Sequence, residues 1–424
     1  MKQLIKVKSD AYYDEVVAIR RQLHQHPELS FCEKETAELI KRVLASKDIE
    51  YQSDIAGTGI VATIKGEPSF RAKSRPERSE SIRQRRINLL QVNEISPFRY
   101  APVEMTGRII ALRADMDALP IQEQNDIPYR SVNEGVMHAC GHDAHTAMLL
   151  GVALILNDLR DHFSGTVKLI FQPGEEKLPG GASLMIKEGV LDNVDLIIGQ
   201  HVYPDLPCGE VGFHAGPYMA SSDEVSITVK GRGGHAAKPA ERDNTLLAAA
   251  KIVLKLSELY PENDKSNGLL AFGSLIADGT YNVVPSEVTM KGTMRTFDEN
   301  KRKLLKDNIL MIANNVAAEY GCKAEVVIEQ GYPSLKNDVE LTEKCVALAK
   351  DYLGDSKVKN LPQLMTAEDF AWYSQKVPAC FYRLGTANSV KGIDSKQHTS
   401  TFDIDEESMK IGMETMVNLT LNLL

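Results

Sequence analysis

The sequence of 424 residues lacks any long hydrophobic run. Its longest apolar stretch, glycine included, covers residues 147–156, well short of the ~20 residues that a membrane-spanning helix needs. Residues 1–14 alternate in charge and contain no apolar segment of the kind found in signal peptides. We therefore expect a protein with no membrane partner.

The sequence also lacks a Cys-x-x-Cys pair. Its six cysteines are scattered over positions 32, 140, 208, 322, 345 and 380. This spacing is not typical of a disulfide scaffold, so we expect a reducing compartment and a cytoplasmic location.

Positive charge is in deficit. The chain has 49 Lys and Arg against 58 Asp and Glu, a formal net charge of −9. A protein whose main partner is nucleic acid needs a basic face, so the balance argues against that class. The composition, 43% hydrophobic and 25% charged, is that of a globular chain with buried cores, and its length suggests two or three domains.

Short apolar runs alternate with helical patterns in the first half of the chain. Apolar runs at residues 108–113, 166–171 and 195–199 each end at polar residues, as buried strands do, and the last stops just before His201. Helical spacing occurs at residues 11–24, 33–45 and 144–159. The alternation predicts an α/β fold with a largely parallel mixed sheet flanked by helices. In such sheets ligands gather at the carboxyl ends of the strands.

The pattern changes near residue 219. A β-α-β-β-α-β order follows, at residues 224–230, 245–259, 269–276, 287–296, 301–320 and 324–329. This order is typical of a small α+β, ferredoxin-like sandwich. Helix and strand then resume at residues 339–353 and 379–384. We predict a catalytic α/β domain of residues 1–218 and 331–424, interrupted by a small α+β domain at residues 219–330.

Residues 70–106 fit neither predicted domain. They are rich in arginine and separate the predicted strand at residues 59–64 from the one at residues 108–113. A surface excursion is the simpler interpretation of this insertion. The alternative is a basic flap that contacts an anionic ligand or a neighbouring subunit.

Side chains that bind transition metals lie near the predicted strand ends. They occur in four places: the stretch HACGHD at residues 138–143, Glu175-Glu176, His201 and His398. Thiolate, imidazole and carboxylate together suit a metal such as zinc or manganese. A single histidine or buried cysteine is usually structural, but the combination favours a metal site.

Four motifs, in this order, resemble the M20 family of metallo-amidohydrolases. They are RADMDALP at 113–120, HACGHD at 138–143, QPGEE at 172–176 and GRGGHAA at 231–237. The similar branch contains aminoacylase-like, hippurate-hydrolase-like and auxin-conjugate-hydrolase-like enzymes. The resemblance runs from about residue 19 to the C-terminus, apart from residues 70–106. It implies that the inserted small domain mediates dimerisation, and hence a homodimer.

The resemblance also implies a site for two divalent metal ions, zinc or manganese, with cobalt and nickel as alternatives. The implied metal ligands are Cys140, His142, Glu176, His201 and His398. Glu175 would be the general base, and Asp117 would orient a ligand. His235 of a second subunit would stabilise the oxyanion, although on the residues alone it is a loop histidine. Asn282 and Arg295 would bind a substrate carboxylate, although the strand pattern alone puts Arg295 on an exposed face.

Several neighbouring residues receive a supporting role or none. Asp115 is less certain as a ligand, because Cys140 and His142 take over that duty in this branch. His138 and His145 are interpreted as structural or supporting. His24 follows a helix and is not expected to bind metal, and the other five cysteines have no partner that spacing implies.

The implied reaction is hydrolysis of an N-acyl amino acid to a carboxylate and a free amino acid. A dipeptidase or other exopeptidase of the same fold is the nearest alternative, but no carboxylate in the motifs is assigned to bind a free α-amine. A non-catalytic metal-binding assembly protein is disfavoured by the intact Glu175 and ligand set. Residues 365–370 resemble a stretch that lies near the site in this family. Thr366 and Ala367, beside Glu368, stand where the family usually has Gly and Ser, so the resemblance leaves the acyl group and the amino acid undetermined.

Overall fold

The computed structural model describes residues 1–67, 107–261 and 268–424. The predicted insertion at residues 70–106 therefore lies outside the described residues. Within the described part of the chain, no helix combines the length and the apolar character that a membrane crossing requires.

The larger sheet is mixed, with a parallel centre. Its strand order is β1-β2-β4-β3-β5-β16-β6-β15. The strands are β1 (Glu50–Ile55), β2 (Gly59–Lys65), β3 (Ile109–Asp115), β4 (Thr166–Gln172), β5 (Leu196–Pro207), β6 (Val211–Phe213), β15 (Val358–Asn360) and β16 (Ala379–Ala387). Neighbours are parallel from β4 through β3 and β5 to β16, whereas β1 and β2 add an antiparallel edge. The predicted α/β class with a largely parallel mixed sheet is confirmed.

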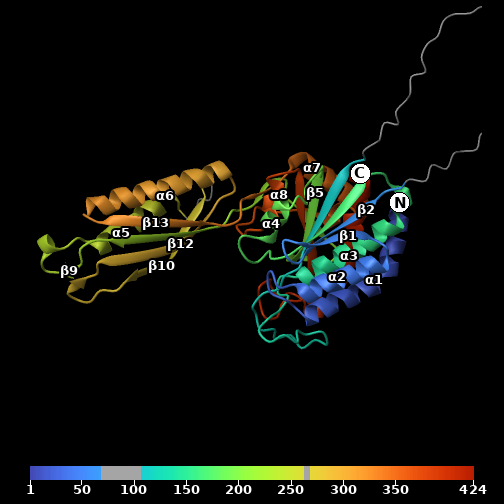
Figure 1. Cartoon of the computed structure of the whole chain (residues 1–424), viewed down its shortest axis with the longest axis horizontal. Helices are drawn as coiled ribbons and strands as arrows, with labels where there is room; N and C mark the ends of the chain where they lie inside the picture. The colour runs from blue at the N-terminus through green and yellow to red at the C-terminus, as the bar shows by residue number, and fades with distance from the viewer. Residues whose placement is uncertain (68–106, 262–267) are drawn as a thin grey trace, which may run out of the picture.

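Helices cover both faces of this sheet (Figure 1). One face is covered by α1 (Lys2–Gln25), α2 (Lys34–Ser46), α3 (His142–Asp158), α7 (Val339–Leu353) and α9 (Glu407–Leu423). The short helices α4 (Gly181–Lys187) and α8 (Ala371–Ser374) pack on the other. Helix α3 is buried along nearly its whole length because α1 and α9 cover the side that faces away from the sheet. It is therefore apolar all round rather than amphipathic.

The second sheet is antiparallel and has its own core. Its order is β10-β12-β8-β13, formed by β8 (Asp223–Lys230), β10 (Leu269–Ala277), β12 (Glu287–Arg295) and β13 (Lys323–Gln330). Helices α5 (Thr245–Leu259) and α6 (Glu299–Glu319) pack on it around a separate apolar cluster. Asn244 and Asp298 cap these helices through their side chains, which fixes where each helix begins. The predicted β-α-β-β-α-β order is confirmed.

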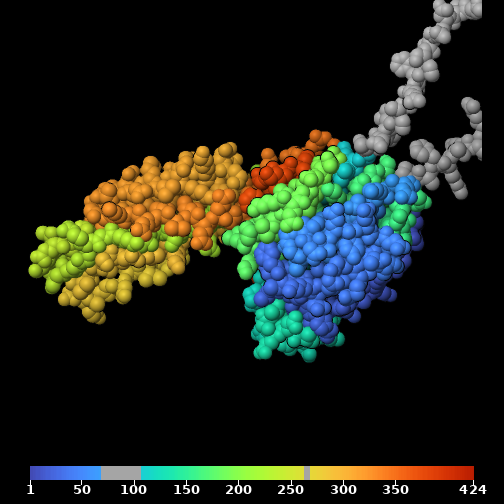
Figure 2. All heavy atoms as spheres, in the orientation of Figure 1, coloured from blue at the N-terminus to red at the C-terminus, as the bar shows by residue number. Residues whose placement is uncertain are grey.

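The unit built on the second sheet extends away from the larger sheet (Figures 1 and 2). At its far end, β9 (Gly234–His235) and β11 (Val283–Val284) pair as a short ribbon. Near the junction, β7 (Gly216–Met219) pairs with β14 (Leu335–Asn337). These strands of two to four residues carry too little pattern for sequence periodicity to detect.

One strand boundary was wrong in the sequence analysis. The predicted strand at 195–199 continues through His201 to Pro207, because Val202 and Tyr203 keep pairing with Leu384 and Gly385 of β16. His201 therefore lies inside β5 rather than after it. Helix α1 is also longer than predicted, since its first turns bury Ile5 against the core.

Candidate metal centre

The candidate site forms where several strands of the larger sheet end. Asp115 is the last residue of β3 and Asp117 follows it, while Glu175 and Glu176 follow β4. His142 is the first residue of α3. The carboxyl ends of parallel strands meet at one edge of a sheet, so these side chains converge as the strand pattern predicts.

A glycine turn brings Cys140 and His142 together. Gly141 has a φ of +92°, and a Cβ at this position would lie 2.5 Å from a methyl group of Val202. Only glycine combines this backbone conformation with so close an approach. The turn therefore presents a thiol and an imidazole, two residues apart, to the same space.

Cys140, Glu176 and His398 form one compact group of potential ligands. Cys140 Sγ lies 3.4 Å from His398 Nε2, which in turn lies 3.1 Å from Glu176 Oε1. Cys140 Sγ also lies 3.6 Å from His201 Nε2. His398 reaches this position with a left-handed backbone (φ 61°), which is uncommon outside glycine and is maintained where the surroundings demand it.

His142 joins this group to the two glutamates. His142, Glu175 and Glu176 each offer a ligand atom within 4.8 Å of the others. The Nε2 atom of His142 lies 4.0 Å from Glu176 Oε1 and 3.7 Å from Asp115 Oδ2. The structure thus brings all five predicted ligands, and Glu175, into one cluster.

The unsatisfied atoms of this cluster fit a metal centre. His142 Nε2 and Glu176 Oε1 are buried atoms without a hydrogen-bond partner among the described residues. The only close contact of Glu176 Oε1 with His398 is an ion pair, at 3.1 Å from Nε2. Buried polar atoms without partners are rare, and ligand atoms that converge on a common cation have this geometry. The donor set of thiol, imidazole and carboxylate suits a divalent transition metal.

Asp117 holds three members of the cluster in place through hydrogen bonds. Its Oδ1 atom accepts hydrogen bonds from the backbone N–H of Glu175 at 3.0 Å and from His142 Nδ1 at 3.2 Å. Its Oδ2 atom accepts from the backbone N–H of Glu176 at 2.9 Å and from the Ser30 hydroxyl at 2.6 Å. Burial alone would raise the pKa of Asp117, but the hydrogen bonds from His142 and Ser30 outweigh it and hold the pKa below its ordinary value.

The orientation of His201 is fixed by its neighbours. Its Nδ1 atom donates to the backbone carbonyl of Val202 at 2.8 Å, which leaves the lone pair of Nε2 facing Cys140. Burial and the adjacent His145 ring, centred 4.4 Å away, lower its pKa, so the ring is neutral as a metal ligand must be. His145 itself is held between Asp115 at 2.6 Å and the backbone N–H of Val202 at 2.9 Å. His145 therefore supports the site from within the core.

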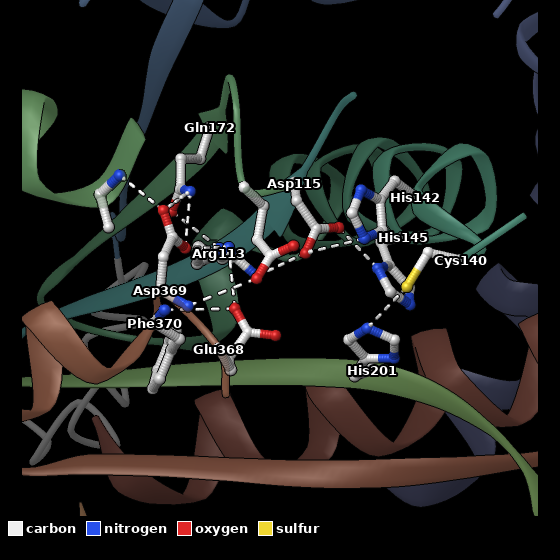
Figure 3. A network of polar contacts seen from close by, with 12 residues as sticks. Arg113, Asp115, Cys140, His142, His145, Gln172, His201, Glu368, Asp369 and Phe370 are labelled. Carbon is white, nitrogen blue, oxygen red and sulfur yellow. Dashed lines mark hydrogen bonds and ion pairs between the residues drawn. The ribbon is translucent and has the colours of Figure 1, made fainter. Parts of the chain in front are cut away.

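Arg113 lies among the carboxyl groups next to the cluster (Figure 3). Its guanidinium pairs with Asp115 at 2.6 Å, Asp369 at 2.7 Å and Glu368 at 3.1 Å. Gln172 accepts a further hydrogen bond from it. This buried network fixes Asp115 on the side of the histidines and Glu368 on the side of the cavity.

Glu175 is buried beside other carboxyl groups. Burial, followed by the charges of Glu368, Glu176 and Asp369, raises its pKa well above the usual range. A carboxyl group with a raised pKa is a stronger base and is suited to accept and then return a proton. The hydroxyl of Tyr332 donates to the backbone carbonyl of Glu175 and so fixes the turn that carries it.

A cavity of about 540 Å³ opens over this cluster. Sequence reasoning missed several residues that line it, namely Tyr203, Tyr332, Arg383 and Gln397. Glu368 and the flanking Thr366 and Ala367 also line it, as their position in the family-like stretch at residues 365–370 suggested. No motif marks Arg383, which is a single charge inside the buried strand β16.

The three residues of the small unit that were predicted to act on the substrate, His235, Asn282 and Arg295, do not lie in one place. His235 and Asn282 are exposed and adjacent in the ribbon of β9 and β11, at the end of the unit far from the larger sheet (Figure 1). Arg295 ends β12 and is half-buried in a second cavity of about 380 Å³, whose lining includes Glu176 and Tyr332. Within one chain, therefore, Arg295 lies close to the metal-type ligands, whereas His235 and Asn282 do not.

Two other histidines near the motifs are buried away from this cavity. His24 contacts Asp143 at 2.8 Å and Glu123 at 3.2 Å, in a structural polar network. His138 has no hydrogen-bond partner among the described residues, and burial lowers its pKa to about 4. Neither belongs to the groups that could hold a metal ion in the described part of the chain.

Comparison with known proteins identifies relatives that match almost the whole chain. Residues 111–422 match the model of peptidase family M20/M25/M40. The N-acetylcysteine deacetylase of Bacillus subtilis is 36% identical over 98% of both chains, and thermostable carboxypeptidase 1 of Saccharolobus solfataricus is 34% identical over 96% of this chain and 95% of its own. Among solved structures, the YXEP protein of Bacillus subtilis, described as a dinuclear metal-binding peptidase of the M20 family, is 33% identical with a TM-score of 0.79 over 98% of each chain.

Proposed function

This chain belongs to peptidase family M20/M25/M40, and we propose that it hydrolyses N-acyl amino acids to a carboxylate and a free amino acid at a site for two divalent metal ions. Members of this family are hydrolases of amide bonds. The observation that carries the proposal is the convergence of Cys140, Glu176 and His398 with His142 and Glu175 below one cavity. The N-acetylcysteine deacetylase relative supports an N-acyl amino acid as the substrate class.

Cys140 lies near the centre of the proposed ligands, because it is grouped with Glu176 and His398 and also contacts His201. His398 Nε2 and His201 Nε2 lie 3.4 and 3.6 Å from its sulfur, and His142 lies two residues along the same turn. We assign Cys140, His142, Glu176, His201 and His398 as the ligands. Divalent ions bound there, zinc or manganese with cobalt and nickel as alternatives, would activate water and polarise the scissile carbonyl group.

Glu175 is the general base of the proposed reaction. It is adjacent in sequence to a ligand, it is buried, and its raised pKa suits a group that takes a proton from the attacking water. The same carboxyl group then gives that proton to the leaving amine. Asp117 holds the Glu175–Glu176 turn by two backbone hydrogen bonds and so positions the base relative to the ligands.

The small unit supplies the remaining groups. We propose that residues 219–330 form a lid and dimerisation domain, and residues 1–218 and 331–424 the catalytic domain. Because His235 lies far from the cavity of its own chain, it would stabilise the oxyanion in the site of a partner subunit. Asn282, adjacent to it, and Arg295 would bind the substrate carboxylate. Exposed apolar side chains on this unit, among them Leu254, Ile276 and Val327, support an interface there.

The carboxypeptidase relative favours a second candidate activity. A carboxypeptidase cleaves an amide bond followed by a free carboxylate, and an N-acyl amino acid has this same arrangement. A C-terminal peptide bond is therefore the most reasonable alternative substrate. We place either activity in the cytoplasm, where thiol ligands remain reduced.

The experiment is a metal-dependent hydrolysis assay. Protein stripped of metal is reloaded with zinc or manganese and tested on N-acetyl amino acids, N-benzoyl amino acids and dipeptides, beside Glu175→Gln. Release of free amino acid from N-acyl substrates, dependent on metal and lost in Glu175→Gln, would establish the proposal. Turnover of peptides alone would establish the exopeptidase instead.

A further inference from the structure

Among the described residues, Arg383 differs from the other buried arginines in having no ion-paired carboxylate. The described residues contain three other buried arginines, and each has at least two acidic partners. Arg20 pairs with Asp143, Asp403 and Glu406, Arg113 with Asp115, Glu368 and Asp369, and Arg302 with Asp223 and Glu299. Arg383 is only 4% exposed, yet it forms no ion pair within the described residues.

The contacts of Arg383 are neutral and weak. Its Nε donates to the Tyr218 hydroxyl at 3.3 Å, and its Nη2 approaches the sulfur of Met219 at 3.2 Å. The rings of Phe381, Tyr203 and Tyr218 lie 5.2, 5.6 and 6.0 Å from the guanidinium carbon. Aromatic faces stabilise a cation only partly, and a buried guanidinium otherwise requires an anion.

This side chain faces the cavity that contains the metal-type ligands. Arg383 lies on β16 directly opposite His201 in the register of β5, and it lines the cavity of about 540 Å³ together with Glu175 and Glu176. Lys396, another cation of the lining, already pairs with Asp205. Glu368 also lines the cavity, but its carboxylate pairs with Arg113 at 3.1 Å. The guanidinium of Arg383 is therefore a fixed positive charge in the cavity wall, and its N–H groups can still donate hydrogen bonds to a ligand.

We propose that Arg383 binds a carboxylate of the substrate inside the metal cavity and so determines substrate specificity. This inference rests on the proposed amidohydrolase function. A planar guanidinium held by aromatic rings is suited to grip a carboxylate through two parallel hydrogen bonds. The carboxylate has two sources. It is either the α-carboxylate of the amino acid, which Arg383 would bind together with Asn282 and Arg295, or a second carboxylate on the acyl group, as in an N-succinyl amino acid.

Three matched substrates separate these sources. They are N-acetyl-L-methionine, its amide N-acetyl-L-methioninamide, and N-succinyl-L-methionine. Arg383→Met is expected to raise KM about 10- to 100-fold, with kcat changed much less, for the substrate whose carboxylate it binds. If that is the α-carboxylate, the preference for N-acetyl-L-methionine over its amide falls by the same factor. If it is the acyl carboxylate, only N-succinyl-L-methionine is affected.

Two further variants keep the test specific. Arg383→Lys retains the charge and should recover part of the lost KM effect, which a purely packing role would not predict. Lys396→Met removes a cation from the same cavity that is already ion-paired, and the substrate preferences should survive it. An equal loss on all three substrates in Arg383→Met, or a loss in kcat alone, would overturn the proposal.

A binding measurement separates this inference from the proposed reaction. Calorimetric titration of the three compounds into metal-replete Glu175→Gln, with and without Arg383→Met, reports affinity without turnover. Weaker binding of a carboxylate-bearing compound by about 10- to 100-fold in the double variant supports the role of Arg383 even if the wild-type protein cleaves none of the three. Unchanged affinities for all three contradict it, whatever the activity.

Discussion

The carboxylate of Asp117 lies 3.2 Å from Nδ1 of His142. Because one ring nitrogen is engaged in this contact, the other, Nε2, is turned toward Glu176. The two backbone hydrogen bonds that Asp117 accepts from the Glu175–Glu176 turn make it the common support of a ligand and of the proposed base.

Replacing Asp117 with Asn tests this support. All four groups that contact the carboxylate donate to it, so the amide NH₂ of asparagine must face a donor. We expect Asp117→Asn to bind zinc or manganese about 10- to 100-fold more weakly. Titration of the stripped protein against a competing chelator measures this.

Ser30→Ala provides the matched control for that variant. It removes one hydrogen bond to Oδ2 and leaves the contacts with His142 and the two backbone N–H groups intact. Its metal affinity should remain close to that of the wild-type protein. Equal losses in both variants would mean that Asp117 acts through general packing and not through ligand orientation.

The adjacent residues Glu175 and Glu176 should separate catalysis from metal binding. Glu175→Gln is expected to keep its metal but lose about 10²- to 10⁴-fold in kcat, because the amide cannot take a proton from water. Glu176→Gln should lose metal instead, since Glu176 belongs to the compact ligand group with Cys140 and His398. Metal content and kcat are measured on both variants, and we expect kcat alone to fall in Glu175→Gln and metal content to fall in Glu176→Gln. Loss of metal in Glu175→Gln would contradict the assignment of the base.

Elements with strong local signals were predicted well. Helices α5 and α7 begin and end as the periodicity indicates, and Asn244 and Asp338 cap them. Asp115 at the end of β3 and Glu175-Glu176 after β4 lie close together because the carboxyl ends of neighbouring parallel strands meet at one edge of the sheet. What lay in short, local patterns was therefore accessible from the sequence.

Features that depend on tertiary pairing were not accessible. The position of His201 inside β5 depends on continued pairing with β16, which the local pattern does not encode. Arg383 is a charge within a buried strand, and only the β5–β16 register puts it on the cavity side. The contact between Tyr332 and the backbone of Glu175 joins residues 157 positions apart. Such contacts have no periodicity for a sequence to display.

A buried carboxyl group remote from the site gives a pH-dependent prediction. Glu414 of α9 is 3% exposed and accepts a hydrogen bond from Tyr352 at 3.0 Å. Burial raises its pKa, and the Tyr352 hydrogen bond only partly opposes this. The folded state therefore holds this proton more tightly than the unfolded state, so the contribution of Glu414 to stability is greatest at acidic pH and declines as pH rises through the folded-state pKa.

Glu414→Gln should accordingly be more stable than the wild-type protein at neutral pH. Glutamine keeps an acceptor for Tyr352 and removes the cost of ionising a buried group. The difference in free energy of unfolding should shrink as pH falls toward the ordinary pKa of a glutamate. Urea unfolding at several pH values measures it, and a difference that does not vary with pH would refute the ionisation argument.

His235 provides a test of the proposed action across a dimer. His235→Ala and Glu175→Gln each inactivate every site of their own homodimer, since each removes a proposed catalytic group. In a mixed dimer, the site with an intact Glu175 receives an intact His235 from the partner subunit. Random pairing on co-expression should therefore restore about a quarter of wild-type activity. If His235 acted within its own chain, the site that retains Glu175 would lack His235 and the other would lack Glu175, and the mixture would stay inactive. Sedimentation of the wild-type protein checks that it forms the dimer this result requires.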